Sequence, residues 1–111
     1  MTLQIRLGTR RSATVDDPLN RRTIGWAEGM NEQECWEAGR GVWRLDATRA
    51  LEQDEVQIIN QSGIIVAVGS INAVVKHGER REVQGRLKPG DPRVGTSTTI
   101  RFGTHNPISY G

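Results

Sequence analysis

The chain has a single cysteine, five aromatic residues and no long hydrophobic run. Cys35 cannot form an internal disulfide, and with only two histidines beside it no structural zinc site reaches four nitrogen or sulfur ligands. The longest apolar stretch, residues 64–68, has the length of a strand, whereas a membrane-spanning helix needs roughly 20 residues. The N-terminus has no apolar segment, so we expect no signal peptide. These absences argue against a membrane or secreted protein and favour the cytoplasm.

The length of 111 residues allows one domain and argues against two independent cores. Charged residues make up 25% and hydrophobic residues 35%, so the chain is not depleted enough in apolar residues for disorder to be expected. Cys35 lies among Glu32, Glu34 and Glu37, which would raise the pKa of its thiol. We therefore expect Cys35 to be inert.

The charge is unevenly distributed along the chain. Residues 1–25 carry a net charge of +3, residues 26–55 carry −5 and residues 56–111 carry +4. Most of the cations are arginine, whose planar guanidinium makes bidentate hydrogen bonds to phosphate and guanine better than the lysine ammonium does. A GC-rich genome also raises the arginine content of its proteins, and this is a simpler explanation of the arginine excess than a role in binding. Two basic flanks around an acidic middle permit a nucleic-acid surface without requiring one.

Two helix starts are visible in the sequence. Asn31, followed three positions later by Glu34, forms an approximate capping box, which predicts a helix that ends near Gly39. Asp46 is a suitable N-cap for a second, brief helix over residues 47–53.

The first part of the chain predicts a strand followed by an arm. Apolar and polar residues alternate over residues 3–7 with the period of a half-buried strand. Residues 8–22 have few apolar side chains, which predicts an exposed loop. We therefore expect residues 1–25 to form a strand and a basic polar arm ahead of a single domain over residues 26–111.

The second half of the chain is rich in β-branched residues. Residues 55–60 and 64–75 predict a hairpin, closed by a three-residue loop that ends in Gly63. Gly69 and Ser70 interrupt the second strand, which suggests a bulge or a bend. Further strands are predicted at residues 42–45, 81–87 and 97–102, with an extended tail at 106–110.

These elements predict a mainly β (α+β) fold with one clear helix and one short helix. About six strands in consecutive antiparallel hairpins bury more surface as a curled barrel than as an open sheet, and the barrel leaves fewer edge strands with unpaired backbone groups. We therefore predict a small curled antiparallel barrel.

Motifs of catalysis are scarce in this sequence. It contains no phosphate-binding loop, dinucleotide fingerprint or serine elbow, and no carboxylates at a recognisable metal-ligand spacing. His77 and His105 are the residue types that a metal-independent ribonuclease uses, but both would have to reach one phosphate. His77 falls in a predicted turn and His105 in the tail. We therefore expect no catalytic residue, no metal and no cofactor.

Three of the five aromatic residues are tryptophan, and they lie between the arm and the hairpins. Trp36 belongs to the apolar face of the predicted helix and is expected in the core. Trp43 is bracketed by Arg40 and Arg44, and an indole beside guanidinium groups can stack on a nucleobase while the arginines hold phosphates. Filling the core is an equal alternative for Trp43. Trp26 is expected to be partly exposed.

Several segments together resemble a known family of small barrels. They are the helix end with the strand after it (38–45), a hairpin (57–66), a Gly-Arg-Leu triplet (85–87), an Asp-Pro loop (91–95) and the last residues (106–110). Over residues 31–111 this pattern resembles PUA-like barrels of the EVE and SRA kind, which occur in phage and bacterial proteins, sometimes beside HNH nucleases.

The resemblance implies a reader of modified nucleic acid, in which an altered base enters a pocket with aromatic walls, often after flipping out of the duplex. Such a site needs an aromatic stack, a polar group that reads the base edge, and cations for the flanking phosphates. The residues that the resemblance implies for these roles are Trp43 and Trp26 for stacking, Ser70 or Asn72 for the base edge, and Arg40, Arg44 and Arg101 for the phosphates.

We therefore predict a nonenzymatic nucleic-acid-binding module, with modified DNA favoured over RNA, that can act beside a nuclease in another chain. Two alternatives stay open. One is a protein-interaction factor, such as a phage-type inhibitor or a regulatory subunit, that acts through the acidic segment at 28–55. The other is a small metal-independent ribonuclease that uses His77 and His105. No membrane partner is expected.

Overall fold

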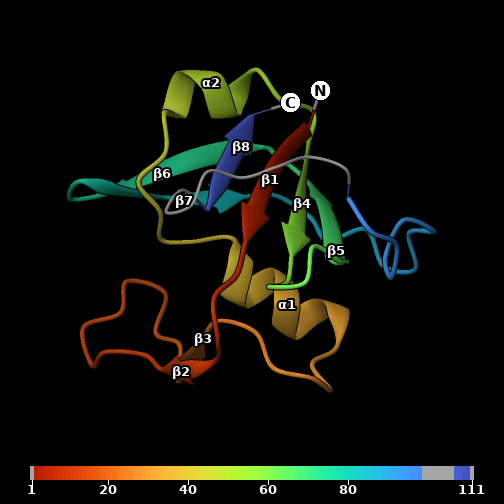
Figure 1. Cartoon of the computed structure of the whole chain (residues 1–111). Helices are drawn as coiled ribbons and strands as arrows, with labels where there is room; N and C mark the ends of the chain where they lie inside the picture. Colours follow the sequence, from red (N-terminus) through yellow and green to blue (C-terminus); the bar gives the residue numbers. More distant parts are fainter. Residues whose placement is uncertain (1, 99–106, 111) are drawn as a thin grey trace.

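The computed structural model describes residues 2–98 and 107–110 of the chain. The largest unit within them is a four-stranded sheet with the order β5-β4-β1-β8 (Figure 1). Its strands are β1 (Thr2–Arg6), β4 (Glu55–Ile59), β5 (Ile65–Ser70) and β8 (Ile108–Tyr110). Two antiparallel ladders join β2 (Arg11–Ser12) to β3 (Thr23–Ile24) and β6 (Ala73–His77) to β7 (Arg80–Gln84). The helices are α1 (Glu32–Gly39) and α2 (Ala47–Leu51).

Strand β1 lies inside the main sheet, between β4 and β8. It pairs in parallel with β4, with Ile5 opposite Ile58, and antiparallel with β8. The predicted all-antiparallel arrangement is therefore wrong at the β1–β4 pair. Residues 7–54, with the arm and both helices, carry the chain from the end of β1 back to the start of β4, and a crossover of that length permits parallel pairing.

The mainly β class with two helices is confirmed, but the described sheets do not close into a barrel. Strand β5 ends at Ser70, where the sequence predicts a bulge or a bend, and the chain then enters the β6–β7 hairpin. Backbone hydrogen bonds from Ser70 to Arg86 (2.9 Å) and from Lys88 to Val68 (2.8 Å) attach the segment after β7 to β5. The sheet therefore curls at this break, but among the described residues no ladder joins β6 to β8.

Helix α1 packs against β4 and β5 and covers the core. Its start is the predicted capping box, because Asn31 Oδ1 accepts from Glu34 N at 2.8 Å and Glu34 Oε1 accepts from Asn31 N at 3.1 Å. Trp36 is 3% exposed, which confirms its place in the core. Helix α2 begins at the predicted N-cap, Asp46, whose Oδ1 accepts from Arg49 N at 3.0 Å.

The hairpin turns lie where the sequence predicts them. Gly63 (φ 80°) and Gly78 (φ 64°) adopt the left-handed conformation that side chains rarely take. The strand predicted at residues 42–45 is reduced to a single bridge to β7. The tail expected at 106–110 contributes strand β8 to the main sheet, and most of the strand predicted at 97–102 lies outside the described residues.

The arm, residues 8–25, leaves the end of β1 and returns towards α1 (Figure 1). The β2–β3 ladder draws it into a loop, with Arg11 opposite Ile24. Backbone hydrogen bonds from Trp26 to Gly8 (2.8 Å) and from Arg10 to Trp26 (3.0 Å) close the base of this loop. The loop is largely exposed, as predicted, and its backbone hydrogen bonds give it a defined path next to the helix.

Gly69→Ala is expected to destabilise the fold. A Cβ at this position would lie 2.5 Å from Cζ3 of Trp36 and 2.8 Å from the carbonyl oxygen of Arg86, so a buried ring and backbone would have to shift. Overpacking of this kind lowers the free energy of unfolding by about 1–3 kcal/mol, which urea unfolding measures. Gly8→Ala is the matched control, since its Cβ would meet nothing within 4 Å. An equal loss in both variants would contradict the packing argument.

Candidate functional site

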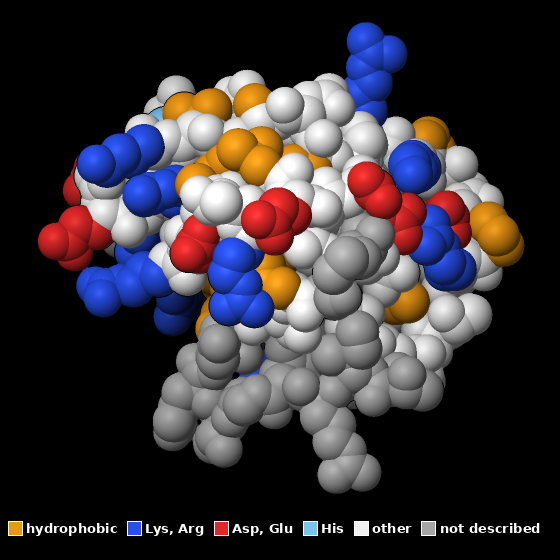
Figure 2. Space-filling model, turned by 90° about the horizontal axis from the view of Figure 1, so that it is seen from above, with side chains coloured by type: hydrophobic (Ala, Val, Ile, Leu, Met, Phe, Trp, Pro, Cys, Tyr) orange, Lys and Arg blue, Asp and Glu red, His pale blue; other side chains and the backbone are white. Residues whose placement is uncertain are grey.

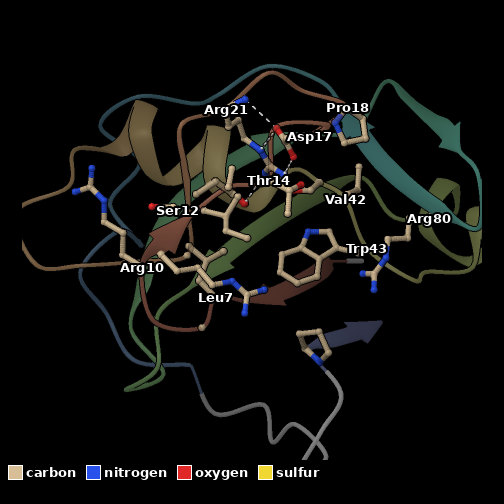
Figure 3. Close-up of a pocket in the computed structure, with 18 of the residues that line it drawn as sticks. Leu7, Arg10, Ser12, Thr14, Asp17, Pro18, Arg21, Val42, Trp43 and Arg80 are labelled. Atoms are coloured by element: carbon tan, nitrogen blue, oxygen red, sulfur yellow. Dashed lines mark hydrogen bonds and ion pairs between the residues drawn. The ribbon is translucent and has the colours of Figure 1, made fainter.

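A cavity of about 1170 Å³ opens between the arm, the end of α1 and the β6–β7 hairpin (Figure 3). The indole of Trp43 lies in the middle of this view, and Arg80 lies beside it. The charged residues that line the cavity are five arginines and two neighbouring aspartates, namely Arg6, Arg10, Arg11, Arg21 and Arg80, with Asp16 and Asp17. The cavity therefore combines a surplus of positive charge with one aromatic ring.

Trp43 is held in place by three hydrogen bonds. Its backbone N–H and carbonyl pair with the carbonyl and N–H of Arg81, both at 2.8 Å, and its Nε1 donates to the carbonyl of Gly39 at 2.7 Å. The ring is half-buried, packs against the core and also borders the cavity. Because the indole nitrogen is used within the fold, the ring offers a ligand its apolar surface.

Arg21 fixes the arm to α1. Its Nη1 donates to the carbonyl of Ala38 at 3.2 Å and also to those of Glu37 and Gly41, at the helix end where carbonyls lack helical partners and the dipole is negative. Its Nε and Nη2 donate to Asp17 at 3.0 and 2.8 Å. Both side chains are almost buried, and the hydrogen bonds from Arg21 hold the pKa of Asp17 below its usual value. One wall of the cavity depends on this pair.

Arg40 belongs to an internal ion-pair network. Its Nη1 lies 2.5 Å from Glu82 Oε2, and its Nε donates to Glu37 at 3.0 Å. The other oxygen of Glu82 lies 2.7 Å from His77 Nε2. The sequence predicted that Arg40 contacts phosphate, but the structure gives its guanidinium two carboxylates and does not place it in the lining of the cavity.

Ser70 and Asn72, the predicted readers of a base edge, lie at and just after the end of β5. Ser70 Oγ accepts from Arg86 N at 3.1 Å and lies 3.5 Å from Asn72 Oδ1. Neither residue lines the cavity, so the structure does not bring them to Trp43.

The other predicted site residues are dispersed. Arg44 is exposed and lies 4.0 Å from Glu79, outside the cavity lining. Trp26 is half-buried against the core and does not line the cavity either. Arg101 and His105 lie outside the described residues. Of the residues predicted to bind nucleic acid that the structure describes, Trp43 alone borders the cavity; His77, predicted for the ribonuclease alternative, also lines it.

Sequence reasoning assigned none of the cavity's arginines to nucleic-acid binding. Arg10 and Arg11 come from the arm, and Arg80 comes from the β6–β7 hairpin. The +3 charge of residues 1–25 was an available signal. That the arm folds back over α1 depends on the contacts of Arg21, which no local pattern reveals.

Other kinds of site have little support in the described residues. Among them, no group of three histidine, cysteine or acidic residues could hold a metal ion, and no helix is long and apolar enough to cross a membrane. Burial raises the pKa of the Cys35 thiol to about 11; nearby Glu34 and Glu32 add to this rise, against an opposing effect of Trp26. This thiol is therefore protonated at neutral pH and a poor nucleophile.

Comparison with known proteins assigns the chain to no family. No family model matches it, and no curated protein or solved structure is significantly similar to it. The resemblance to PUA-like barrels therefore rests on the sequence segments alone, and the function must follow from the chemistry of the cavity.

Arg21→Ala is expected to lower the free energy of unfolding by about 3 kcal/mol, because it leaves the nearly buried Asp17 carboxylate and the carbonyls at the end of α1 without their partner. Urea unfolding measures this loss. Arg22→Ala removes the same charge from an exposed neighbour and is expected to change the free energy by less than about 0.5 kcal/mol. Equal effects of the two variants would refute the role of Arg21.

The contribution of Asp17 to stability is expected to depend on pH. Since its pKa is lower in the folded than in the unfolded chain, the stabilisation is fully present above the unfolded value of about 3.9 and is lost as the pH falls through the folded value. The difference in free energy of unfolding between the wild type and Asp17→Asn should therefore be constant above about pH 5 and shrink below about pH 4. A difference that stays constant down to pH 2 would show that the charge of Asp17 is irrelevant.

Proposed function

We propose that the chain binds nucleic acid in this cavity, with a base against Trp43 and phosphates on the surrounding arginines. The observation that supports this function is the combination of the Trp43 ring with the arginines in one lining. Aromatic stacking and phosphate neutralisation are the two sources of affinity in modules that bind unpaired nucleotides.

Three arginines of the cavity are available for phosphates. Arg10, Arg11 and Arg80 are exposed, and within residues 2–98 and 107–110 no ion pair to a carboxylate is found for them. Asp17 is neutralised by Arg21, so the acidic side of the lining is weakened. The resulting positive potential attracts a polyanion and predicts binding that weakens with salt.

The size of the cavity favours a base that has left the duplex. A volume of about 1170 Å³ admits nucleotides but not a double helix. Modified DNA, read through a flipped-out base, is the ligand that we put first, and an unpaired strand is its closest equivalent. Within the described lining Trp43 is the single aromatic residue, so a base would stack on one ring without a closed cage.

A protein-interaction role through the acidic segment at 28–55 has less support. Several of its carboxylates have partners inside the chain, such as Asp46 at the α2 cap and Glu55, which is paired with Arg93 and Lys88. On the face shown in Figure 2, acidic and basic side chains are interspersed, without a continuous acidic surface.

Binding is tested with fluorescently labelled DNA at several salt concentrations. The probes are a duplex with one methylated cytosine, the same duplex unmodified, and one of its strands alone. We expect binding at 50 mM salt, with the logarithm of the association constant falling linearly with the logarithm of the salt concentration. Tighter binding of the methylated than of the unmodified duplex is expected. Absence of binding to all three probes at 50 mM salt would refute the function.

Arg10→Ala should reduce the salt dependence of duplex binding, because one phosphate contact fewer lowers the slope by about 0.9. Arg86→Ala, which removes an exposed arginine outside the cavity lining, is the matched control and should leave the slope unchanged. The same change of slope in both variants would point to nonspecific attraction.

Trp43→Ala should weaken binding of the single strand by about 5- to 100-fold, as expected for the loss of one base–aromatic stack. Trp43→Phe keeps an aromatic surface and should retain most of the affinity. Thermal unfolding of both variants checks that the fold is intact. If Trp43→Ala, still folded, binds as the wild type does, the base does not stack on this ring.

A further inference from the structure

His77 lines the cavity, and its ring is held by a hydrogen bond to a residue outside the cavity lining. It is the last residue of β6, pairs with Arg80 across the turn and belongs to the cavity lining. Its Nε2 lies 2.7 Å from Oε1 of Glu82, a carboxylate whose side chain is only 7% exposed. The other carboxylate oxygen of Glu82 is 2.5 Å from Arg40 Nη1.

This arrangement determines which nitrogen of the neutral imidazole carries the hydrogen. A carboxylate paired with a guanidinium is an acceptor only, so the hydrogen between Glu82 and His77 must come from Nε2. The Nδ1 atom then carries a bare lone pair and can only accept. Within the described part of the chain, no hydrogen bond to Nδ1 is found.

The orientation is costly to reverse. Turning the ring would break the bond to a carboxylate that is almost buried, and that carboxylate would lose one of its two partners. Arg40 is in turn held by Glu37 in α1, so the carboxylate cannot easily follow the ring. A histidine fixed in this way discriminates between donors and acceptors, whereas a freely rotating side chain would adapt to either.

We propose that His77 reads the edge of a base in the cavity and favours bases with an amino group over bases with oxygen at the same position. Cytosine and adenine present an N–H donor at C4 and C6, whereas thymine, uracil and guanine present oxygen. The bare Nδ1 of His77 can accept a hydrogen bond from the amino group of cytosine or adenine. Next to the oxygen of thymine, uracil or guanine, two lone pairs face each other and no hydrogen bond forms. This role rests on the proposed nucleic-acid binding, and it replaces the role that the sequence predicted for Ser70 and Asn72.

The test compares decamers of deoxycytidine and deoxyuridine at pH 8 and 50 mM salt, where imidazole side chains are ordinarily neutral. These strands present unpaired bases that differ at C4 and at the adjoining N3, with the same backbone charge. We expect the wild type to bind oligo(dC) about three- to tenfold more tightly than oligo(dU), the effect of one hydrogen bond. His77→Ala should reduce the ratio of the two affinities to less than twofold while both strands still bind.

Arg80→Ala is the matched control from the same turn. It removes a phosphate contact, so it should weaken the binding of both strands by a similar factor and leave the ratio of their affinities unchanged. A loss of the ratio in Arg80→Ala but not in His77→Ala would overturn the assignment to His77.

A second measurement does not depend on the stability of the alanine variant. Long-range ¹H–¹⁵N spectra of the wild type should show the hydrogen of the His77 ring on Nε2, and the Nδ1 resonance should move with oligo(dC) and not with oligo(dU). Glu82→Gln should mix the two tautomers and reduce the preference for cytosine. A ring protonated on Nδ1, or equal binding of both strands with normal salt dependence, would overturn the reading role and leave the proposed function intact. Absence of binding to either strand would overturn both.

Discussion

The cavity depends on the contact of Arg21 with the end of α1. The guanidinium satisfies carbonyls that the helix leaves without partners and at the same time pairs with Asp17 on its own arm. Because both side chains are almost buried, the pair is screened little by solvent and fixes the arm beside the helix. The β2–β3 ladder shapes the arm itself, but it is the Arg21 pair that joins the arm to the helix end and so places the arm's arginines on the cavity that Trp43 borders.

A second network supports the opposite wall in the same way. Glu82 in β7 joins Arg40, just after α1, to His77 at the end of β6. The carboxylate is buried and has a partner on each oxygen, as a buried charge requires. This network ties the β6–β7 hairpin to the helix and leaves one nitrogen of His77 without an internal partner among the described residues. The two networks thus separate structural arginines, Arg21 and Arg40, from the arginines that remain for a ligand.

Local signals in the sequence predicted local structure well. The caps at Asn31 and Asp46 and the turn at Gly63 act within a few residues, so they can be recognised without knowledge of the fold. The parallel pairing of β1 with β4 could not be predicted in this way, because it depends on where a crossover of some fifty residues delivers the chain. The same holds for the cavity: Trp43 was recognised from its arginine neighbours, but one of these, Arg40, is paired internally.

The central claim is that a nucleic acid occupies the cavity between the arm and Trp43. The most direct measurement follows the indole N–H of each tryptophan and the Nε–H of the arginines by NMR while a short unpaired DNA strand is added at low salt. The account predicts that the signals of Trp43, Arg10, Arg11 and Arg80 shift together and saturate, while that of the buried Trp36 stays in place. Shifts confined to the acidic segment at 28–55, or no shifts at all, would contradict it.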